Sequence, residues 1–491
     1  MRSFFLYLLL APLFSFSQEQ IGSDINGEAR NDKSGTSVSL SADGSIVAIG
    51  APDNQSGLNA HSGHVRVYKY ESNSWRQIGK DIDGIGNTDF SGKSVSLSAN
   101  GNIVAIGANG NRDNGWASGH VRVFEYKNNI WTQIGDNISG ESDNDQSGIT
   151  VSLSGDGNIL AIGAYLNDGN GTDSGHVRVY QNISGSWTQI GTDIDGEFRG
   201  DQSGSSLSLS SNGNVLAIGS IINNASGTES GHVRIFENNS GVWTQIGKDI
   251  DGENPYDSFG SSISLSSDGK IIAIGAIYNN GNGEKSGNVR VFENNLENWI
   301  QIGNDIVGEK AFNRFGSSVS LSEDGKIIAI GAIKNGDNGI NSGHVRMYKN
   351  IYGSWIQIGN DIDGENSQDS SGRSISLSAD GKIVAIGAPL NDARGENSGH
   401  VRVYDVNLDT FSSTSINQDY FSYYPNPVKN EVNLILNSGL ELKQVNIYNI
   451  QSQYLFSIKE SKIDVTHLSS GMYLFEVETN QGKSAKKILI E

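Results

Sequence analysis

The sequence predicts an all-β protein: a seven-bladed β-propeller with four-stranded blades, followed by a small C-terminal β-sandwich. Three observations lead to this prediction. A unit of 56 residues occurs seven times, every unit contains a two-residue hairpin turn, and the chain is rich in Gly (62 residues) and poor in Pro (6 residues). Many short antiparallel strands joined by Gly-containing turns, repeated at a fixed period, are typical of propellers.

The repeat is marked by the motif Ser-Gly-His-Val-Arg-Val, which returns with small variations at a constant interval of 56 residues. Its third position is occupied in turn by His64, His120, His176, His232, Asn288, His344 and His400. A Trp follows eleven residues later in six units, and Phe411 takes its place in the seventh. Because no insertion accumulates, we expect near-identical units side by side. We interpret the His and Trp sets as packing residues, with metal binding and sugar stacking as the alternatives.

Each unit is predicted to form four strands, as the second unit illustrates. Residues 93–98 alternate between polar and apolar side chains, and residues 103–108 form an apolar run expected of a strand buried on both faces. Residues 119–126 and 131–138 are the third and fourth strands. The first two strands are joined by Asn100-Gly101, and every other unit has Asp-Gly or Asn-Gly at this place, as a type I′ turn requires.

The two ends of the repeat region predict how the ring closes. The last unit lacks the usual Trp-containing fourth strand, whereas residues 20–25 match residues 77–82, the end of a fourth strand. We therefore expect the N-terminal strand to complete the seventh blade and to cover its edge.

The N-terminus is predicted to be a signal peptide over residues 1–17. Arg2 precedes an apolar run from Phe4 to Phe16, and Ser15 and Ser17 suit cleavage before Gln18. The alternative is a short buried strand. No later segment is apolar enough to span a membrane, and the chain has no Cys. The net charge of −20 argues against nucleic acid as a partner.

Residues 18–417 resemble the FG-GAP repeat of integrin-α-type propellers. The resemblance rests on Phe259-Gly260 and Phe315-Gly316 at the start of first strands, and on the Gly-Ala-Pro segments 50–52 and 387–389. Most units are variants of these motifs. In calcium-binding members of the family an Asp-x-Asp-x-Asp-Gly loop joins the two halves of a unit. A tight turn takes its place here, so the resemblance does not carry over that calcium site.

Residues 418–491 are predicted to be a separate domain. They contain Tyr424-Pro-Asn-Pro427, the runs 444–449 and 463–468, Gly471-Met-Tyr-Leu474 and a Lys-Lys-Ile-Leu-Ile-Glu end. These motifs resemble the C-terminal sorting domain of the type IX secretion system of Bacteroidetes. The resemblance implies type IX-like export machinery as a partner and a secreted or outer-cell-surface location, often with cleavage of the tail and attachment to lipopolysaccharide. The alternative is a generic C-terminal β-domain.

Blade topology predicts where a ligand would bind. The long loops between second and third strands, and between successive blades, lie at one end of the propeller, where they form an acidic, Asn-rich rim. Carboxylates at one repeat position are candidate calcium ligands, with turn capping as the favoured alternative. They are Asp32, Asp89, Asp145, Asp201, Asp257 and Asp369. Departures from the repeat make Trp116, Tyr256 and Arg394 the candidate ligand-binding residues, and residues 312–314 a further departure.

These observations favour a secreted or cell-surface binding or adhesion scaffold that presents its rim to a glycan or protein ligand. Identical blades supply the same group seven times, whereas catalysis needs unlike groups in one place, so we expect no enzyme and no certain cofactor beyond possible calcium. Two alternatives stay open: a polysaccharide-active enzyme with its site in the central channel, and a structural surface-coat protein.

Overall fold

The structure is a computed structural model that describes residues 18–55, 60–351, 353–406, 421–425, 427–437, 439–449, 454–480 and 482–490. The predicted signal peptide and Phe411 lie outside these residues. The chain divides into two compact units, Met1–Val406 and Asn407–Glu491, which are described separately. The described residues form strands and turns without a helix, so the all-β prediction is confirmed. In particular, they contain no helix that could cross a membrane.

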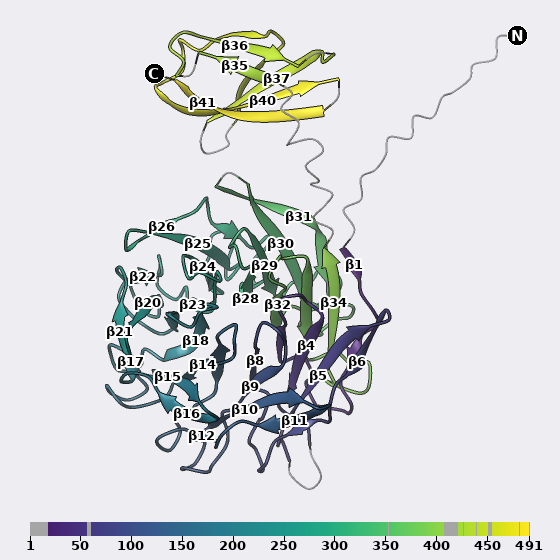
Figure 1. Ribbon diagram of the computed structural model, residues 1–491, viewed down its shortest axis with the longest axis vertical. Coiled ribbons are helices and arrows are strands. Elements are labelled where there is room, and N and C mark those ends of the chain that lie inside the picture. Colours follow the sequence, from purple (N-terminus) through teal and green to yellow (C-terminus); the bar gives the residue numbers. More distant parts are fainter. Residues whose placement is uncertain are drawn as a thin grey trace, which may run out of the picture. The chain divides into compact units, whose positions relative to one another are not determined.

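Residues 18–406 form seven antiparallel sheets arranged around a centre (Figure 1). The first three sheets comprise β3 (Ser37–Leu40), β4 (Ile46–Ala51), β5 (His64–Glu71), β6 (Ser74–Gln77) and β7 (Ile82–Asp83); β8 (Ser94–Leu97), β9 (Ile103–Ala108), β10 (His120–Lys127), β11 (Ile130–Gln133) and β12 (Ile138–Ser139); and β13 (Thr150–Leu153), β14 (Ile159–Ala164), β15 (His176–Ile183), β16 (Ser186–Gln189) and β17 (Ile194–Asp195).

The remaining four sheets follow the same order. They comprise β18 (Ser203–Leu209), β19 (Val215–Ser220), β20 (His232–Asn239), β21 (Val242–Gln245) and β22 (Ile250–Asp251); β23 (Phe259–Leu265), β24 (Ile271–Ala276), β25 (Asn288–Asn295), β26 (Asn298–Gln301) and β27 (Ile306–Val307); β28 (Phe315–Leu321), β29 (Ile327–Ala332), β30 (His344–Ile351) and β31 (Ser354–Asp363); and β32 (Ser374–Leu377), β33 (Ile383–Ala388) and β34 (His400–Val406) with β1 (Gln18–Gln20) and β2 (Ile25–Asn26).

The fourth strand differs in detail from the prediction. The expected strand over residues 131–138 is split into β11 and β12, which both pair with β10. Gly135 lies between them at φ +70°, a conformation that interrupts the extended backbone. In the sixth sheet the strand is continuous as β31, and a register shift against β30 absorbs the irregularity.

The N-terminal segment completes the seventh sheet, as predicted. Gln18 pairs with Val406 through β1 and β34, and Ile25 pairs with Val401 through β2 and β34. The Trp set binds successive sheets together in the same way. Trp75 Nε1 donates to the Ile21 carbonyl at 2.9 Å, and the other five Trp side chains make the equivalent bond to the preceding unit. The Trp residues therefore act as packing residues between neighbouring sheets.

Three hydrogen-bond rings around the centre explain the polar positions of the first strands. The amide of each first-strand Leu donates to a Ser hydroxyl of the preceding sheet, as when Leu97 N donates to Ser39 Oγ at 2.9 Å. In the opposite sense, Ser94 Oγ donates to the Gly148 carbonyl of the following sheet at 2.8 Å. A third ring joins the turns between first and second strands backbone to backbone at 2.8–3.0 Å, and it closes where Ala379 N donates to the Ala42 carbonyl. The Ser residues that alternate with apolar residues in the first strands thus join neighbouring sheets, either by accepting from a Leu amide or by donating to a Gly carbonyl.

The hydrophobic core of this unit lies between neighbouring sheets. The second strands are buried throughout, and the cluster that contains Val65 and Val67 of the first sheet also contains Val104 and Ile106 of the second. Equivalent clusters lie between the other sheets. Burial on both faces explains the apolar runs of the second strands.

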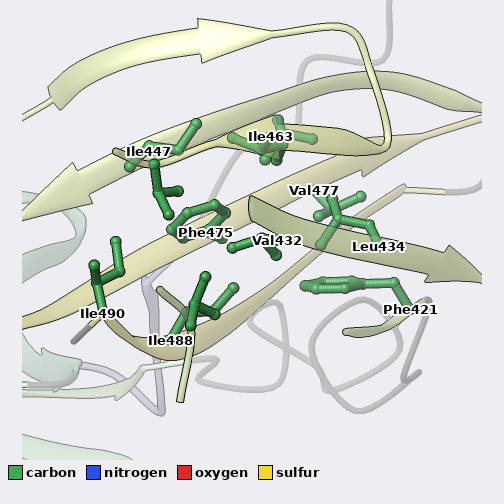
Figure 2. Close-up of a cluster of buried hydrophobic side chains, with 12 residues drawn as sticks. Phe421, Val432, Leu434, Ile447, Ile463, Phe475, Val477, Ile488 and Ile490 are labelled. Carbon is green, nitrogen blue, oxygen red and sulfur yellow. The ribbon is translucent and has the colours of Figure 1, made fainter. Parts of the chain in front are cut away.

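The C-terminal unit consists of a three-stranded and a four-stranded antiparallel sheet. The strands are β35 (Phe421–Tyr424), β36 (Glu431–Leu436) and β39 (Lys462–Asp464), and β38 (Tyr454–Ile458), β37 (Leu442–Asn449), β40 (Gly471–Thr479) and β41 (Gly482–Ile490). Both sheets contribute to one core, in which Phe421 and Val432 lie with Ile447, Phe475 and Ile488 (Figure 2).

Candidate functional site

The long loops of the propeller unit pair with one another at one end of the ring. The loop between the second and third strands of each sheet lies against the connection that leads to the next sheet. In the second sheet, Asn144 N donates to the Trp116 carbonyl at 2.7 Å, and each of the other sheets has an equivalent bond. We call each such pair a double loop and this end of the ring the loop end. The opposite end, which carries the Asp-Gly and Asn-Gly turns, is the turn end.

The six candidate calcium ligands are buried within separate double loops. Asp89 is typical: its carboxylate accepts hydrogen bonds from Ile85 N at 3.1 Å, from Gly86 N at 2.7 Å and from Asn111 Nδ2 at 3.2 Å. Equivalent bonds to turn amides hold Asp32, Asp145, Asp201, Asp257 and Asp369. These bonds support turn capping. Calcium binding stays a prediction, since the Oδ1 atoms of Asp201 and Asp257 are buried without a partner.

The repeated His residues lie beside carboxylates, and the sequence analysis did not predict these contacts. His176 Nδ1 is 3.5 Å from Asp193 Oδ2 and 3.9 Å from Glu141 Oε2, and similar groups surround His64, His232 and His400. Burial lowers the pKa of His176 to about 4, so the imidazole is neutral at physiological pH. The triad offers metal ligands, but Arg178 Nη1 lies 3.6 Å from Glu141 Oε1. A guanidinium at that place disfavours a divalent cation, so we interpret these triads as polar networks that support the loops.

The three candidate ligand-binding residues are exposed but lie apart from one another in the ring. Trp116 (59% exposed) lies between β9 and β10, and Tyr256 (58% exposed) lies between β22 and β23. Arg394 lies between β33 and β34, where it lines a shallow cavity with Arg66 and Trp75. The structure thus places all three at the loop end without bringing them into one site.

A cavity of about 540 Å³ at the loop end contains residues that the sequence analysis did not single out, apart from Arg314. It is lined by the ends of inner strands and by loop residues of the first, second, sixth and seventh sheets. Its charged lining residues are Lys33, Asp53, Lys93, Arg314, Lys334 and Arg373. Apolar side chains, including Phe90 and Ile333, form part of the wall. The signal that would have found these residues is a cation at a repeat position where other units have neutral side chains.

The electrostatics of this cavity are dominated by positive charge. Lys33 Nζ lies 2.6 Å from Asp53 Oδ2, and His61 Nδ1 lies 3.2 Å from the other oxygen of the same carboxylate. Burial, with the charge of Arg373 as the next cause, lowers the pKa of Lys93. Burial and then the charge of Arg314 lower the pKa of Arg373, although the residue is partly exposed to solvent. Such a cluster is suited to bind an anion.

Comparison with known families confirms both resemblances found in the sequence. Residues 422–491 match the family described as secretion system C-terminal sorting domain. Three segments, residues 139–180, 243–292 and 309–348, match the FG-GAP repeat family. The sorting domain indicates export by a type IX secretion system and a secreted or cell-surface location. No curated protein sequence matches the chain.

Solved structures with a similar fold are distant in sequence. A putative 6-phosphogluconolactonase from Bacteroides uniformis has a TM-score of 0.47 and 16% identity, covering 67% of this chain and 85% of that chain. U3-55K has a TM-score of 0.48 and 15% identity, with coverages of 79% and 99%. A periplasmic gluconolactonase from Pseudomonas aeruginosa has a TM-score of 0.49 and 14% identity, with coverages of 86% and 98%. Likenesses this low carry no argument about activity.

Proposed function

We propose that this protein, a propeller with FG-GAP repeats and a type IX sorting domain, is a cell-surface binding scaffold that recognises a glycan through aromatic side chains at its loop end. The observation that carries the proposal is a set of exposed aromatic residues in the double loops. They are Trp116, Phe198, Tyr256 and Phe312.

These aromatic residues stand at positions where most other units have a small or polar side chain, with Ile340 as the exception at the position of Trp116. Thr172 and Thr228 take the place of Trp116 in the next two sheets, and Asn144 and Gln368 take the place of Tyr256. The backbone hydrogen bonds of the double loops hold these rings in place at the surface, and loops positioned by a scaffold are where binding residues commonly lie. Flat rings stack on the apolar faces of sugars, while the hydroxyl of Tyr and the indole N–H of Trp can donate hydrogen bonds.

An enzymatic function in the channel is the untested alternative. Glycoside hydrolysis commonly uses two carboxyl groups that flank the bond to be cleaved. The described residues that line the loop-end cavity include one carboxylate, Asp53, which already contacts Lys33 and His61. This lining supports binding better than hydrolysis.

A glycan array probed with the mature chain, residues 18–491, tests the proposal. We expect binding to a restricted set of glycans and a loss of roughly 10-fold in affinity for Trp116→Ala or Tyr256→Ala, since one stacking contact contributes about 1–1.5 kcal/mol. Ile130→Ala is the matched control, because Ile130 is equally exposed (62%) but lies on the β10–β11 hairpin, away from the double loops. Equal binding by all three variants, or no glycan bound, would contradict the proposal.

A further inference from the structure

The loop-end cavity is a second feature, separate from the exposed aromatic residues. None of Trp116, Phe198, Tyr256 and Phe312 lines it. Its volume of about 540 Å³ lies within the range of small-molecule sites, and its wall combines apolar side chains with charged ones. What this cavity binds is therefore a question independent of glycan recognition.

Four of the five positive charges of the cavity come from two repeat positions, and Lys334 comes from a third, after a second strand. At the position that follows the first-strand Gly, Lys93 and Arg373 stand where five other units have Thr36, Ile149, Ser205, Ser261 and Ser317. At the position that follows the turn-capping Asp or Asn, Lys33 and Arg314 stand where the others have Phe90, Gln146, Gln202, Ser258 and Ser370. The cations thus belong to the first, second, sixth and seventh sheets, which are adjacent once the ring is closed. The third, fourth and fifth sheets contribute none at these positions.

Of the five cations, only Lys33 forms an ion pair among the described residues, although the charge of Asp53 also acts to raise the pKa of Lys93. The structure records no hydrogen bond or ion pair for the side chains of Lys93 and Arg373 among the described residues. The carboxylate of Asp53 is shared by Lys33 and His61. Because acidic residues outnumber basic ones by 55 to 35 in this chain, carboxylates are abundant elsewhere, and a cavity with five cations and one carboxylate runs against the overall charge. Mutual repulsion among such cations is unfavourable unless an anion joins them.

We propose that the loop-end cavity binds a small molecule that carries at least two oxyanion groups, phosphate or carboxylate. The guanidinium groups of Arg314 and Arg373 can each bind an oxyanion through two parallel hydrogen bonds, and Lys93 adds a point charge. Phe90 and Ile333 supply apolar wall for the carbon skeleton of the ligand. The site is asymmetric within a nearly symmetric ring, as recognition of a single ligand requires.

Binding should be visible as thermal stabilisation, because the ligand relieves the repulsion present in the free protein. Inorganic pyrophosphate and citrate are the two probes, and sodium chloride at matched ionic strength is the reference. We expect a saturable rise in Tm with at least one probe and a smaller effect of the chloride. A response to pyrophosphate assigns the site to phosphate groups, and a response to citrate alone assigns it to carboxylates.

The variant Lys93→Ser/Arg373→Ser removes two of the cavity cations that form no ion pair. Ser stands at the same repeat position in the fourth, fifth and sixth sheets, so the substitution suits the local backbone. We expect the variant to lose at least about 10-fold in probe affinity and to unfold at the same or a higher temperature than the wild type without ligand. The single variants Lys93→Ser and Arg373→Ser provide the same readout should the double variant not fold.

Two controls keep this test separate from that of the glycan proposal. Lys270→Gln removes a positive charge from the turn end, where Lys270 lies beside Asp268, and it should leave probe binding unchanged. Trp116→Ala should likewise leave it unchanged. The proposal is overturned if neither probe binds, if chloride reproduces the rise in Tm, or if the cavity variants respond like Lys270→Gln.

Discussion

The two ends of the propeller unit differ in how closely the repeat is kept. At the turn end, seven equivalent turns are joined backbone to backbone, and the ring of first-strand Leu residues lines a narrow cavity of about 220 Å³. At the loop end, equivalent positions hold different residues, such as Trp116 and Thr172, or Lys93 and Ser205. Where a side chain bonds to the next unit, as the first-strand Ser hydroxyls do with the Leu amides, the same residue recurs in every unit. Where they face solvent, they are free to differ, and the differences mark the candidate sites.

The largest expected effect comes from opening the ring itself. Deletion of residues 18–25 removes β1 and most of the contacts of β2 with β34, which exposes an edge of the seventh sheet. We expect Tm to fall by 10 °C or more, on the order of several kcal/mol, or the chain to aggregate. Differential scanning calorimetry on the purified proteins measures this effect. An unchanged Tm would show that the ring does not depend on its N-terminal strand.

A smaller loss of stability is expected when one hydrogen bond between first strands is removed, and it should exceed the effect of a substitution at the loop end. Ser152→Ala leaves the amide of Leu209 without the acceptor that it now reaches at 3.1 Å. We expect a loss of about 1–2 kcal/mol in the free energy of unfolding, measured by urea titration. Thr172→Ala, at an exposed double-loop position, should change it by less than about 0.5 kcal/mol. Equal effects of the two substitutions would remove the energetic distinction between the two ends.

Acid should weaken the loop end through its buried His residues. Burial lowers the pKa of His232 to about 4 in the folded state, whereas the unfolded value is near 6.5. Between these values the unfolded state binds more protons, so stability rises with pH and is lost as pH falls from 6.5 to 4. At pH 5 this amounts to about 2 kcal/mol for one such His. We expect Tm to fall between pH 7 and pH 5.

The repeat supplies the control for this pH dependence. Asn288 replaces His in the fifth sheet, where its Nδ2 donates to Asp305 Oδ2 at 2.8 Å. His232→Asn should therefore fold and should show a shallower fall of Tm with acid. Glu197 acts in the opposite direction at lower pH, because burial raises its pKa. A fall in Tm of the same steepness in His232→Asn would assign the acid sensitivity to other groups.

The smallest expected effect concerns calcium. Since the candidate Asp carboxylates already accept hydrogen bonds from turn amides, we expect millimolar calcium to change Tm by less than about 1 °C relative to EDTA. Magnesium serves as the ionic control. A larger, calcium-specific rise that disappears in Asp201→Asn or Asp257→Asn would show that the two unpartnered Oδ1 atoms bind the ion.

The fold could be predicted from the sequence because its causes are local and repeated. The apolar run of β9 and the match of residues 20–25 to residues 77–82 each express one physical requirement of the ring. The place of the Asn100-Gly101 turn was predicted correctly, but its type was not. Only Gly101 has a positive φ (+71°), and the loop comprises residues 99–102, so it is not a two-residue type I′ turn. The loop-end cavity was not predicted, because its cations come from different repeat positions in four sheets, and the repeat pattern does not show which of these side chains line one cavity. The Asp set shows a different limit: the sequence favours turn capping over calcium for a loop carboxylate, but only the hydrogen bonds of the structure support that preference.

The pairing of Gln18 with Val406 makes the integrity of the whole chain a condition for the native ring. The contact between β1 and β34 closes a loop that spans nearly the whole propeller unit. It therefore has the largest loop-closure entropy of the unit, and we expect it to form late in folding. A chain that ends before β34 would keep two unpaired sheet edges, each able to join another molecule. Closure by the N-terminal strand therefore means that a chain with β34 can cover its sheet edges, whereas a chain truncated before β34 leaves them exposed.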